Sequence, residues 1–256
     1  MWRHAALDPA AIQRLKEARA LLDLTPLVVH DNYLINLAAG EPSLRTRSIA
    51  AFRAEIERCL AIDADYLVLH PGSYRGRSME EGIQTLVASL IEAAAGLASG
   101  RLMLLLENTA GSGSAIGSRF EELAAVRRAA AGRTGLRIGY CLDTAHCLAG
   151  GYDVASASGL EKTVRAAGRV LGLSRVKVIH TNDSKAPLGS RVDRHEHIGQ
   201  GYIGMQGFRR ILNHPGLRDK AFILETPIDR EGDDRRNLLK LKRLCRKSRT
   251  TRSRSS

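Results

Sequence analysis

The chain has 256 residues, of which 44% are hydrophobic and 26% are charged, a composition typical of a soluble globular protein. No apolar run approaches the roughly 20 residues that a membrane-spanning helix needs, and the N-terminus has no signal-peptide pattern, so we expect no membrane partner. The formal net charge of +12 favours a polyanionic partner, nucleic acid first, although the basic stretch 240–256 carries much of the excess.

Short apolar runs alternate with helical patterns along the chain. The first helix is expected behind Asp8 and Pro9, because Asp is a strong N-cap and Pro is favoured in the first turn. A strand follows at 26–30, and the next helix spans 43–61. Further strands are predicted at 65–70, 102–107, 137–143, 176–180 and 221–225. Further helices are predicted at 79–98, from 118, at about 155–171, near 206–212 and at 233–244.

The apolar runs are continuous rather than alternating, as expected for parallel strands that are buried on both faces. Strand–helix repetition of this kind predicts an α/β fold, a (β/α) TIM-type barrel, in which catalytic residues lie at the C-terminal strand ends. Such a barrel has eight strands. Six are found here, so we predict a barrel that lacks two strands at its N-terminus.

Each predicted strand ends in a side chain that can bind a metal ion. A single residue of this kind is most often a satisfied core or loop group, because an unpaired buried charge is costly. All six predicted strands end in such a residue, and this is hard to obtain by chance. A barrel would bring them to one cavity, and the residues are His30, His70, Glu107, Asp143, His180 and Glu225.

The polar stretch behind His180 adds further candidate ligands. It holds Asp193 and His195, which alternate and would point the same way in an extended segment. His146 lies three residues behind Asp143. Imidazoles and carboxylates bind Zn²⁺ or Mn²⁺, so the pattern indicates a metal site. The alternative is a charged surface loop with incidental histidines.

The cysteines show no CxxC spacing and are expected to be reduced thiols of a cytoplasmic protein. They are Cys59, Cys141, Cys147 and Cys245. The Arg/Ser-rich tail at 245–256 is expected to be disordered, behind a single barrel domain at 1–244.

At these residues the chain resembles the endonuclease IV family of apurinic/apyrimidinic endonucleases, from about Trp2 to Pro227. The motifs that carry the resemblance are HDNYLINLA (30–38), LHPGSY (69–74), LLLENTAGSGSAIG (104–117), CLDTAH (141–146), IHTNDSK (179–185), SRVDRHEHIGQGYIG (190–204) and ILETP (223–227). The family's first two strands have no counterpart in this chain. The resemblance implies a barrel with three zinc ions, sometimes replaced by manganese, that cleaves DNA on the 5′ side of an abasic site.

The resemblance also implies which residues hold the metal ions. One ion would be held by His30, His70 and Glu107. Glu107 would bridge to a second ion, which is completed by Asp143, His180 and Glu225. The third would be held by His146, Asp193 and His195. Glu107 and Glu225 would be catalytic, since two bridged ions offset phosphate charge and acidify a water molecule that Glu225 could orient.

The expected partner is double-stranded DNA with abasic sites, bound by a monomer associated with the nucleoid. Tyr33 and Leu34 match family residues that wedge into the duplex at the lesion. Contacts to phosphate are expected from Asn36, Lys185, Arg191 and Arg194. Asp183 could orient a ligating imidazole or simply cap its loop.

Two other functions remain open from the sequence. A sugar isomerase or epimerase on a related barrel needs only one divalent ion held by about four carboxylate or imidazole groups, so the other candidate ligands would be surplus. A catalytically inactive, truncated DNA-binding remnant is the third possibility. The metal content separates the first two, and cleavage of an abasic duplex separates the third.

Overall fold

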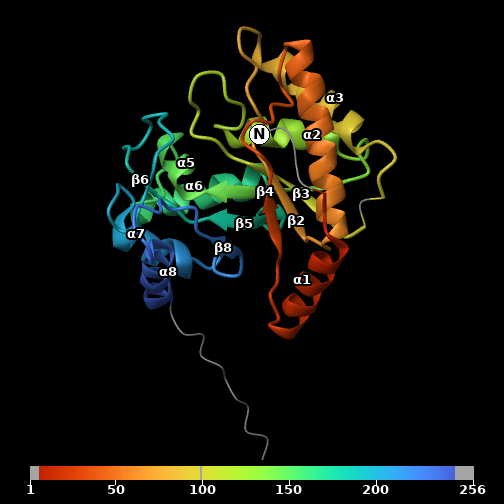
Figure 1. The fold of residues 1–256 in the computed structure, drawn as a ribbon. Helices are drawn as coiled ribbons and strands as arrows, with labels where there is room; N and C mark the ends of the chain where they lie inside the picture. Colours follow the sequence, from red (N-terminus) through yellow and green to blue (C-terminus); the bar gives the residue numbers. More distant parts are fainter. Residues whose placement is uncertain (1–5, 99, 246–256) are drawn as a thin grey trace, which may run out of the picture.

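The computed structural model describes residues 6–98 and 100–245 and contains an open (β/α) barrel (Figure 1). Its parallel six-stranded sheet has the order β1-β2-β3-β4-β5-β8. The strands are β1 (Val28–His30), β2 (Tyr66–Leu69), β3 (Met103–Glu107), β4 (Arg137–Asp143), β5 (Val176–His180) and β8 (Ala221–Ile223). The predictions of a TIM-type barrel and of six parallel strands are confirmed.

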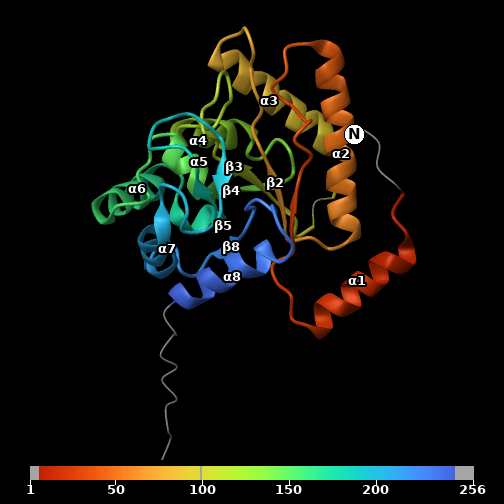
Figure 2. The same cartoon turned by 60° about the vertical axis from the view of Figure 1, so that its left-hand side comes forward.

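The helices lie outside the sheet, and those between α1 and α8 lie in the connections from one strand to the next (Figures 1 and 2). They are α1 (Pro9–Leu21), α2 (Pro42–Ala61), α3 (Met79–Ala94), α4 (Phe120–Ala130), α5 (Thr144–Ala149), α6 (Ala157–Val170), the 3₁₀ turn η1 (Leu173–Arg175), α7 (Gly204–Asn213) and α8 (Asp233–Leu244). Most bounds agree with the predicted ones to within four residues. The sequence pattern missed α5 and the antiparallel hairpin of β6 (Asp183–Ser184) and β7 (His195–Glu196).

Local sequence explains where several helices begin. Asp8 caps α1 by accepting hydrogen bonds from the main-chain N–H groups of Ala10 and Ala11. Ser78 and Glu81 form a reciprocal capping box at the start of α3. Such caps satisfy main-chain donors that have no partner within the helix, so they fix where these helices begin.

Apolar side chains pack on both faces of the sheet. The inner face carries a small cluster formed by Val68, Leu105, Cys141 and Val178, one residue from each of four neighbouring strands. The outer face packs against the surrounding helices in a much larger core that includes Phe52, Phe120 and Phe208. The inner cluster lies two residues before the strand ends, so the next inward position on each strand belongs to the candidate ligands.

The two outer strands of the sheet, β1 and β8, each pair on one side only within the described residues. Beside β1, α1 stands away from the rest of the molecule (Figure 2). It contributes no buried residue and is held through Arg19, which pairs with Asp65. No described helix has the length and apolarity needed to cross a bilayer. The predicted disordered tail falls, apart from Cys245, outside the described residues.

Candidate metal centre

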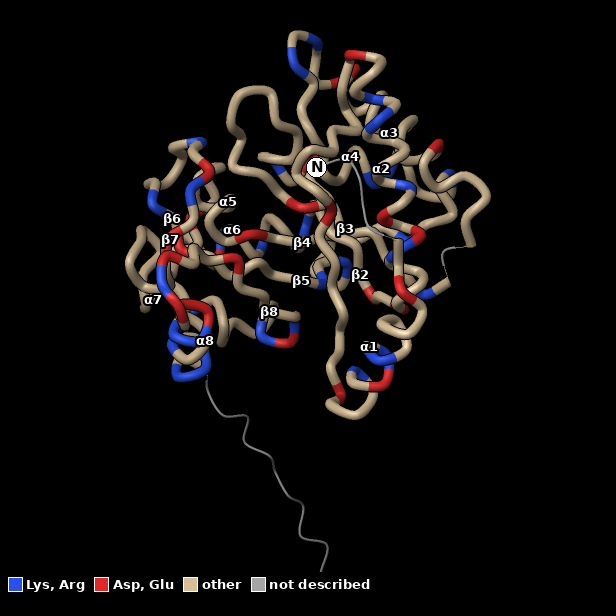
Figure 3. The backbone as a smooth tube through the Cα atoms, viewed as in Figure 1, with Lys and Arg blue, Asp and Glu red and all other residues tan. Residues whose placement is uncertain are grey.

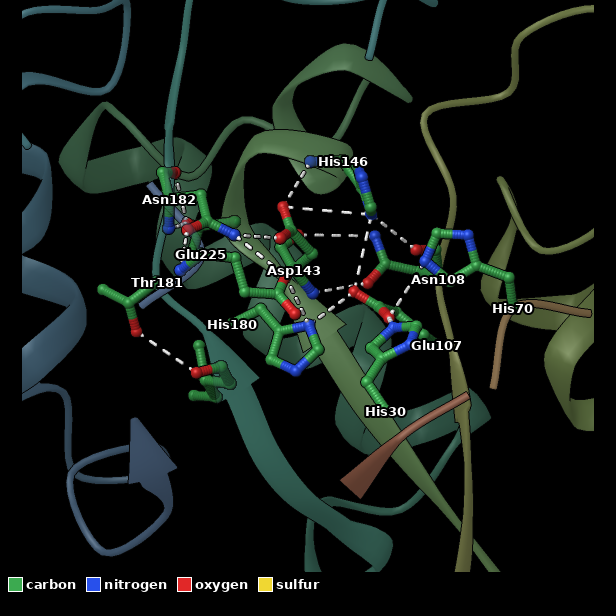
Figure 4. Close-up of polar contacts among 12 residues, drawn as sticks. His30, His70, Glu107, Asn108, Asp143, His146, His180, Thr181, Asn182 and Glu225 are labelled. Atoms are coloured by element: carbon green, nitrogen blue, oxygen red, sulfur yellow. Dashed lines mark hydrogen bonds and ion pairs between the residues drawn. The ribbon is translucent and has the colours of Figure 1, made fainter. Parts of the chain in front are cut away.

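The strand ends bring the predicted ligands together at one rim of the barrel (Figure 4). Because parallel strands end at the same edge, residues from the ends of six strands and the loops behind them point into one space. Glu107 lies at the centre of this group, and its side chain is fully buried. His30 and His70 approach its Oε2 atom at 2.9 and 3.1 Å. His180 Nδ1 lies 2.7 Å from its Oε1 atom.

A second group of acidic side chains surrounds His180. Its Nδ1 atom is 3.1 Å from Glu225 Oε2 as well as close to Glu107. Glu107, Asp143, His180 and Glu225 each offer one ligand atom, and these atoms lie within 4.8 Å of one another. The four groups therefore form the most complete cation-binding arrangement in the described part of the chain.

A third group is formed by His146, Asp193 and His195. His146 Nε2 lies 3.1 Å from Asp193 Oδ2, and His195 Nε2 lies 3.6 Å from Asp193 Oδ1. Asp143 joins this group to the second, because its Oδ2 atom is 3.6 Å from His195 Nε2. The structure thus brings all nine predicted ligands into one connected cluster.

The orientation of the imidazoles fits metal binding. The Nδ1 atoms of His30, His146 and His195 lie 2.9, 2.9 and 3.0 Å from main-chain carbonyl oxygens. Since a carbonyl can only accept, Nδ1 must carry the proton, and Nε2 is left to face the acids. His195 Nε2 is buried and has no hydrogen-bond partner within the described structure. A buried imidazole nitrogen aimed between carboxylates is the arrangement that a bound cation would complete.

Protons and cations compete for these nitrogens. Burial alone would lower the pKa of His30, but its hydrogen bond to Glu107 and the charge of that carboxylate raise the pKa to about 9. Burial likewise opposes charge on His146, and the carboxylates of Asp143 and Asp193 raise its pKa to about 10. Burial would raise the pKa of Glu107, yet His180 and His70 hold it well below its usual range. Metal binding must therefore displace protons.

Two asparagines that the sequence pattern did not single out as part of the metal site hold the carboxylates in place. Asn182 Nδ2 donates to Asp143 Oδ2 at 2.5 Å, and its Oδ1 accepts from the main-chain N–H of Glu225 at 2.8 Å. Asn108 Oδ1 accepts from the N–H of Asp143 at 2.7 Å. Both follow a strand-ending ligand by one or two residues, which is the only sign of their role in the sequence.

Asp183 organises the loop that carries His195. Its buried carboxylate does not touch an imidazole and instead accepts hydrogen bonds from main-chain N–H groups, so the loop-capping alternative is the one seen. The donors are Ser184, Gly199, Gly201, Ile203 and Gly204. A Cβ atom at Gly201 would lie 2.3 Å from the carbonyl oxygen of Ser184, so only glycine allows this approach.

The same loop is tied to the last helix by Asn237, which is 1% exposed. Its Oδ1 accepts from the N–H of Ile198 at 3.1 Å, while its Nδ2 donates to Thr226 Oγ1 at 2.9 Å. Thr226 follows Glu225 directly. One amide thus connects α8 to both the His195 loop and the segment that carries Glu225.

The predicted DNA-contacting residues lie in loops on the same rim. Tyr33 is 88% exposed, and Leu34 beside it is half-buried. Lys185, Arg191 and Arg194 are exposed.

Asn36 differs from the other predicted contacts because its amide is occupied within the protein. Its Nδ2 donates to the carbonyl oxygen of Ser73 and its Oδ1 accepts from the N–H groups of Ser73 and Ala38. It holds the loop behind β2.

Comparisons with known proteins agree with this architecture. A family model described as xylose isomerase-like TIM barrel matches residues 1–247. A probable endonuclease 4 from Solibacter usitatus is 57% identical over 245 residues, which are 96% of this chain and 84% of that protein. Another from Chloroflexus aurantiacus is 43% identical, covering 95% of this chain and 85% of that protein.

Two solved structures distinguish a likeness in family from a likeness in fold alone. Endonuclease IV from Thermus thermophilus superposes with a TM-score of 0.82 at 38% identity, over 95% of this chain and 84% of that one. A D-tagatose 3-epimerase-like protein superposes with a TM-score of 0.69 at 20% identity, over 93% of this chain and 83% of that one. The second likeness concerns the fold alone.

The barrel and its cluster of imidazoles and carboxylates define a xylose isomerase-like TIM barrel with groups that can bind metal ions. Within that class the chain belongs to the endonuclease IV family, as its motifs predict. The family consists of phosphodiester hydrolases, so the prediction of an enzyme of this kind is confirmed.

Proposed function

We propose that this protein is a metal-dependent endonuclease that hydrolyses DNA on the 5′ side of abasic sites, as a monomer, in base excision repair. The observation that carries the proposal is the shared carboxylate of Glu107, which three imidazoles approach within 3.1 Å. A carboxylate that three imidazoles approach is suited to bridging cations. Neighbouring cations are suited to a phosphodiester substrate, because that group already carries a negative charge.

The ligands divide into three sets, which we propose hold three zinc ions that manganese can replace. The sets are His30, His70 and Glu107; Glu107, Asp143, His180 and Glu225; and His146, Asp193 and His195. Bound divalent ions would supply positive charge beside the phosphate and a water molecule acidic enough to be deprotonated at neutral pH. Asn182 would hold the Asp143 carboxylate and the main chain of Glu225, so that both residues stay beside the shared space.

Glu225 is the residue suited to orient the attacking water. Its side chain is 33% exposed, whereas that of Glu107 is fully buried, so it can reach both the cluster and the substrate side. Burial would raise the pKa of Glu225, but its hydrogen bond to His180 and the charge of that imidazole lower it, and the group remains a carboxylate. An anionic oxygen can accept a hydrogen bond from water and fix its direction of attack.

DNA would be recognised by the loops around the cluster. Tyr33, the most exposed aromatic side chain of this rim, follows β1 three residues behind His30 and would enter the duplex at the lesion with Leu34. An abasic nucleotide has no base to unstack, so it would turn towards the metal centre at little cost. Lys185, Arg191 and Arg194 would bind the flanking phosphates.

A duplex with one tetrahydrofuran residue tests the activity. The purified chain with added zinc or manganese should produce a nick with a 3′-hydroxyl group immediately 5′ of the lesion, and no nick in the intact duplex. The Glu225→Gln variant should lose the nick, and the His214→Ala variant, changed at the end of α7, should keep it. Failure of the wild-type chain to nick the lesion with either metal would contradict the proposal.

A sugar isomerase or epimerase is the second candidate because solved epimerase-like structures share the fold. Such an enzyme would need one of the ligand sets, and the other two would have no use. Metal analysis of the zinc-loaded protein separates the two functions. Close to three ions per chain favours the nuclease, and one ion favours the isomerase.

A further inference from the structure

A cavity lies at the other end of the barrel from the histidine cluster. Its volume is about 310 Å³, and it is lined by the starts of β3, β4 and β5 and by the turn behind α4. Arg137 begins β4, and Asp143 ends it. At about 3.3 Å per residue, this places the cavity about 20 Å from the metal ligands.

The lining of this cavity is strongly basic. It contains no aspartate or glutamate, and its charged members are Arg127, Arg137, Arg175 and Lys177. In the described part of the chain, none of these side chains forms a salt bridge. Figure 3 shows Lys and Arg segments gathered at the centre of the view, between the labels of β5 and β2. The positive charge there is left without a protein counter-ion.

A break in the sheet register places Lys177 in this lining. Tyr140 of β4 pairs with Val176, and the next residue, Cys141, pairs with Val178, so Lys177 has no partner on β4. A bulge of this kind turns a side chain out of its regular direction and recurs beside functional sites. Lys177 is half-buried.

Two arginines of the lining, Arg127 and Arg137, are held by main-chain oxygens, which fix their position without neutralising their charge. Arg127 Nε donates to the carbonyl oxygen of Ile138 at 3.1 Å, and Arg137 Nη2 donates to the carbonyl oxygen of Arg101. Lys220 is a further neighbour, and its pKa is lowered by burial and by the charge of Lys177. Fixed guanidinium groups lose little conformational freedom when they bind an oxyanion.

We propose that this basic cavity binds a small phosphorylated anion, either inorganic phosphate or a nucleotide. Guanidinium groups match phosphate oxygens in geometry and charge. The volume is at the lower end of the range for small-molecule sites. The lining also includes Met103, Leu136 and Ile138, which would suit the apolar face of a base. DNA bound at the histidine cluster would lie at the opposite end of the strands, so the two ligands would not compete.

Calorimetric titration of the zinc-loaded protein with inorganic phosphate and with ATP tests the proposal. The cavity variant combines Arg175→Ala with Lys177→Met. Its control combines Lys162→Met with Arg165→Ala on the exposed face of α6, which removes the same charge elsewhere. The wild type and the control should bind at least one of the two ligands with the same affinity. The cavity variant should bind this ligand at least 10-fold more weakly or not at all. Any phosphate bound by the zinc ions should be common to all three proteins.

The ligand that shows this difference identifies the source of the phosphate group. If only ATP does, the site recognises a nucleotide, and if both ligands do, it recognises phosphate itself. Should the double variant fail to fold, Arg137→Met, at an exposed position, serves for the same comparison. Equal affinities in all proteins overturn the proposal. Undamaged duplex DNA is titrated as well. The proposal is also overturned if the cavity variant binds this DNA more weakly but binds phosphate and ATP as the wild type does, because the surface would then be a DNA contact.

Discussion

His195 donates its Nδ1 hydrogen to the main-chain carbonyl oxygen of Glu225, over 3.0 Å. This bond joins the β6–β7 hairpin to the end of β8, which are 30 residues apart in sequence. It places a hydrogen on Nδ1 of His195, so that Nε2 is the nitrogen that faces Asp143 and Asp193. Glu225 belongs to the second ligand set, and its main-chain carbonyl group therefore holds His195 of the third set in place.

Replacing His195 should separate metal binding from folding. In the metal-free protein the described hydrogen bond of its ring is the one to Glu225, worth about 1 kcal/mol. His195→Ala should therefore fold nearly as well as the wild type without metal but should bind one zinc ion fewer and nick abasic DNA more slowly, by about 10²-fold. Metal analysis and denaturant unfolding measure the two effects. His214→Ala is the control, and an unchanged metal content in His195→Ala would contradict the assignment.

Removing the metal ions should destabilise the protein. Ions that bind only the folded chain stabilise it by about 2.7 kcal/mol when their free concentration is 100 times the dissociation constant. A chelator should thus lower the melting temperature, and zinc should restore it. Calorimetry checks this. Glu107→Gln removes the carboxylate that the first two ligand sets share, so this variant should show a smaller zinc-dependent shift than the wild type.

Asp183→Asn should destabilise the fold by about 3 kcal/mol, because an amide nitrogen would replace an accepting oxygen among main-chain donors. The His195 loop should loosen, and nicking activity should fall even at temperatures where the protein stays folded. Asp219→Asn, at a side chain that is 84% exposed, is the matched control and should change the free energy of unfolding little. Urea titration compares the two. Equal stability of both variants would show that the loop does not depend on Asp183.

Gly201→Ala should be harmful for a steric reason. Its Cβ atom would lie 2.3 Å from the carbonyl oxygen of Ser184 and 2.6 Å from Asp183 Oδ1, and both neighbours are fixed. Gly168 lies inside α6, where a Cβ atom would meet only Leu173 at 3.5 Å or more. Gly168→Ala should therefore stabilise the protein by about 0.5–1 kcal/mol. Thermal unfolding of the pair should show shifts of opposite sign.

The sequence predicted the elements that depend on local patterns. The six strands could be found because each is a continuous apolar run that ends in an ionisable residue, as Leu102 to Glu107 does. Six-residue α5 was missed because so short a helix shows no periodicity, although it carries His146. The β6–β7 hairpin was missed because two-residue strands leave no pattern.

Other features depend on contacts between distant residues and could not be predicted from local patterns. The role of Asn182 depends on the position of Glu225, which lies 43 residues further along the chain. Three of the five main-chain donors to Asp183 belong to glycines that lie 16 to 21 residues ahead. The basic cavity needs the register shift between β4 and β5, which has no mark in the sequence.

The central position of Glu107 has a consequence for how the site fills. Because His30, His70 and His180 all contact its two oxygens, a cation that arrives at one set changes the charge and the proton content of the others. Successive ions should not load independently. Titration of the metal-free chain should give a curve that equal and independent sites cannot describe.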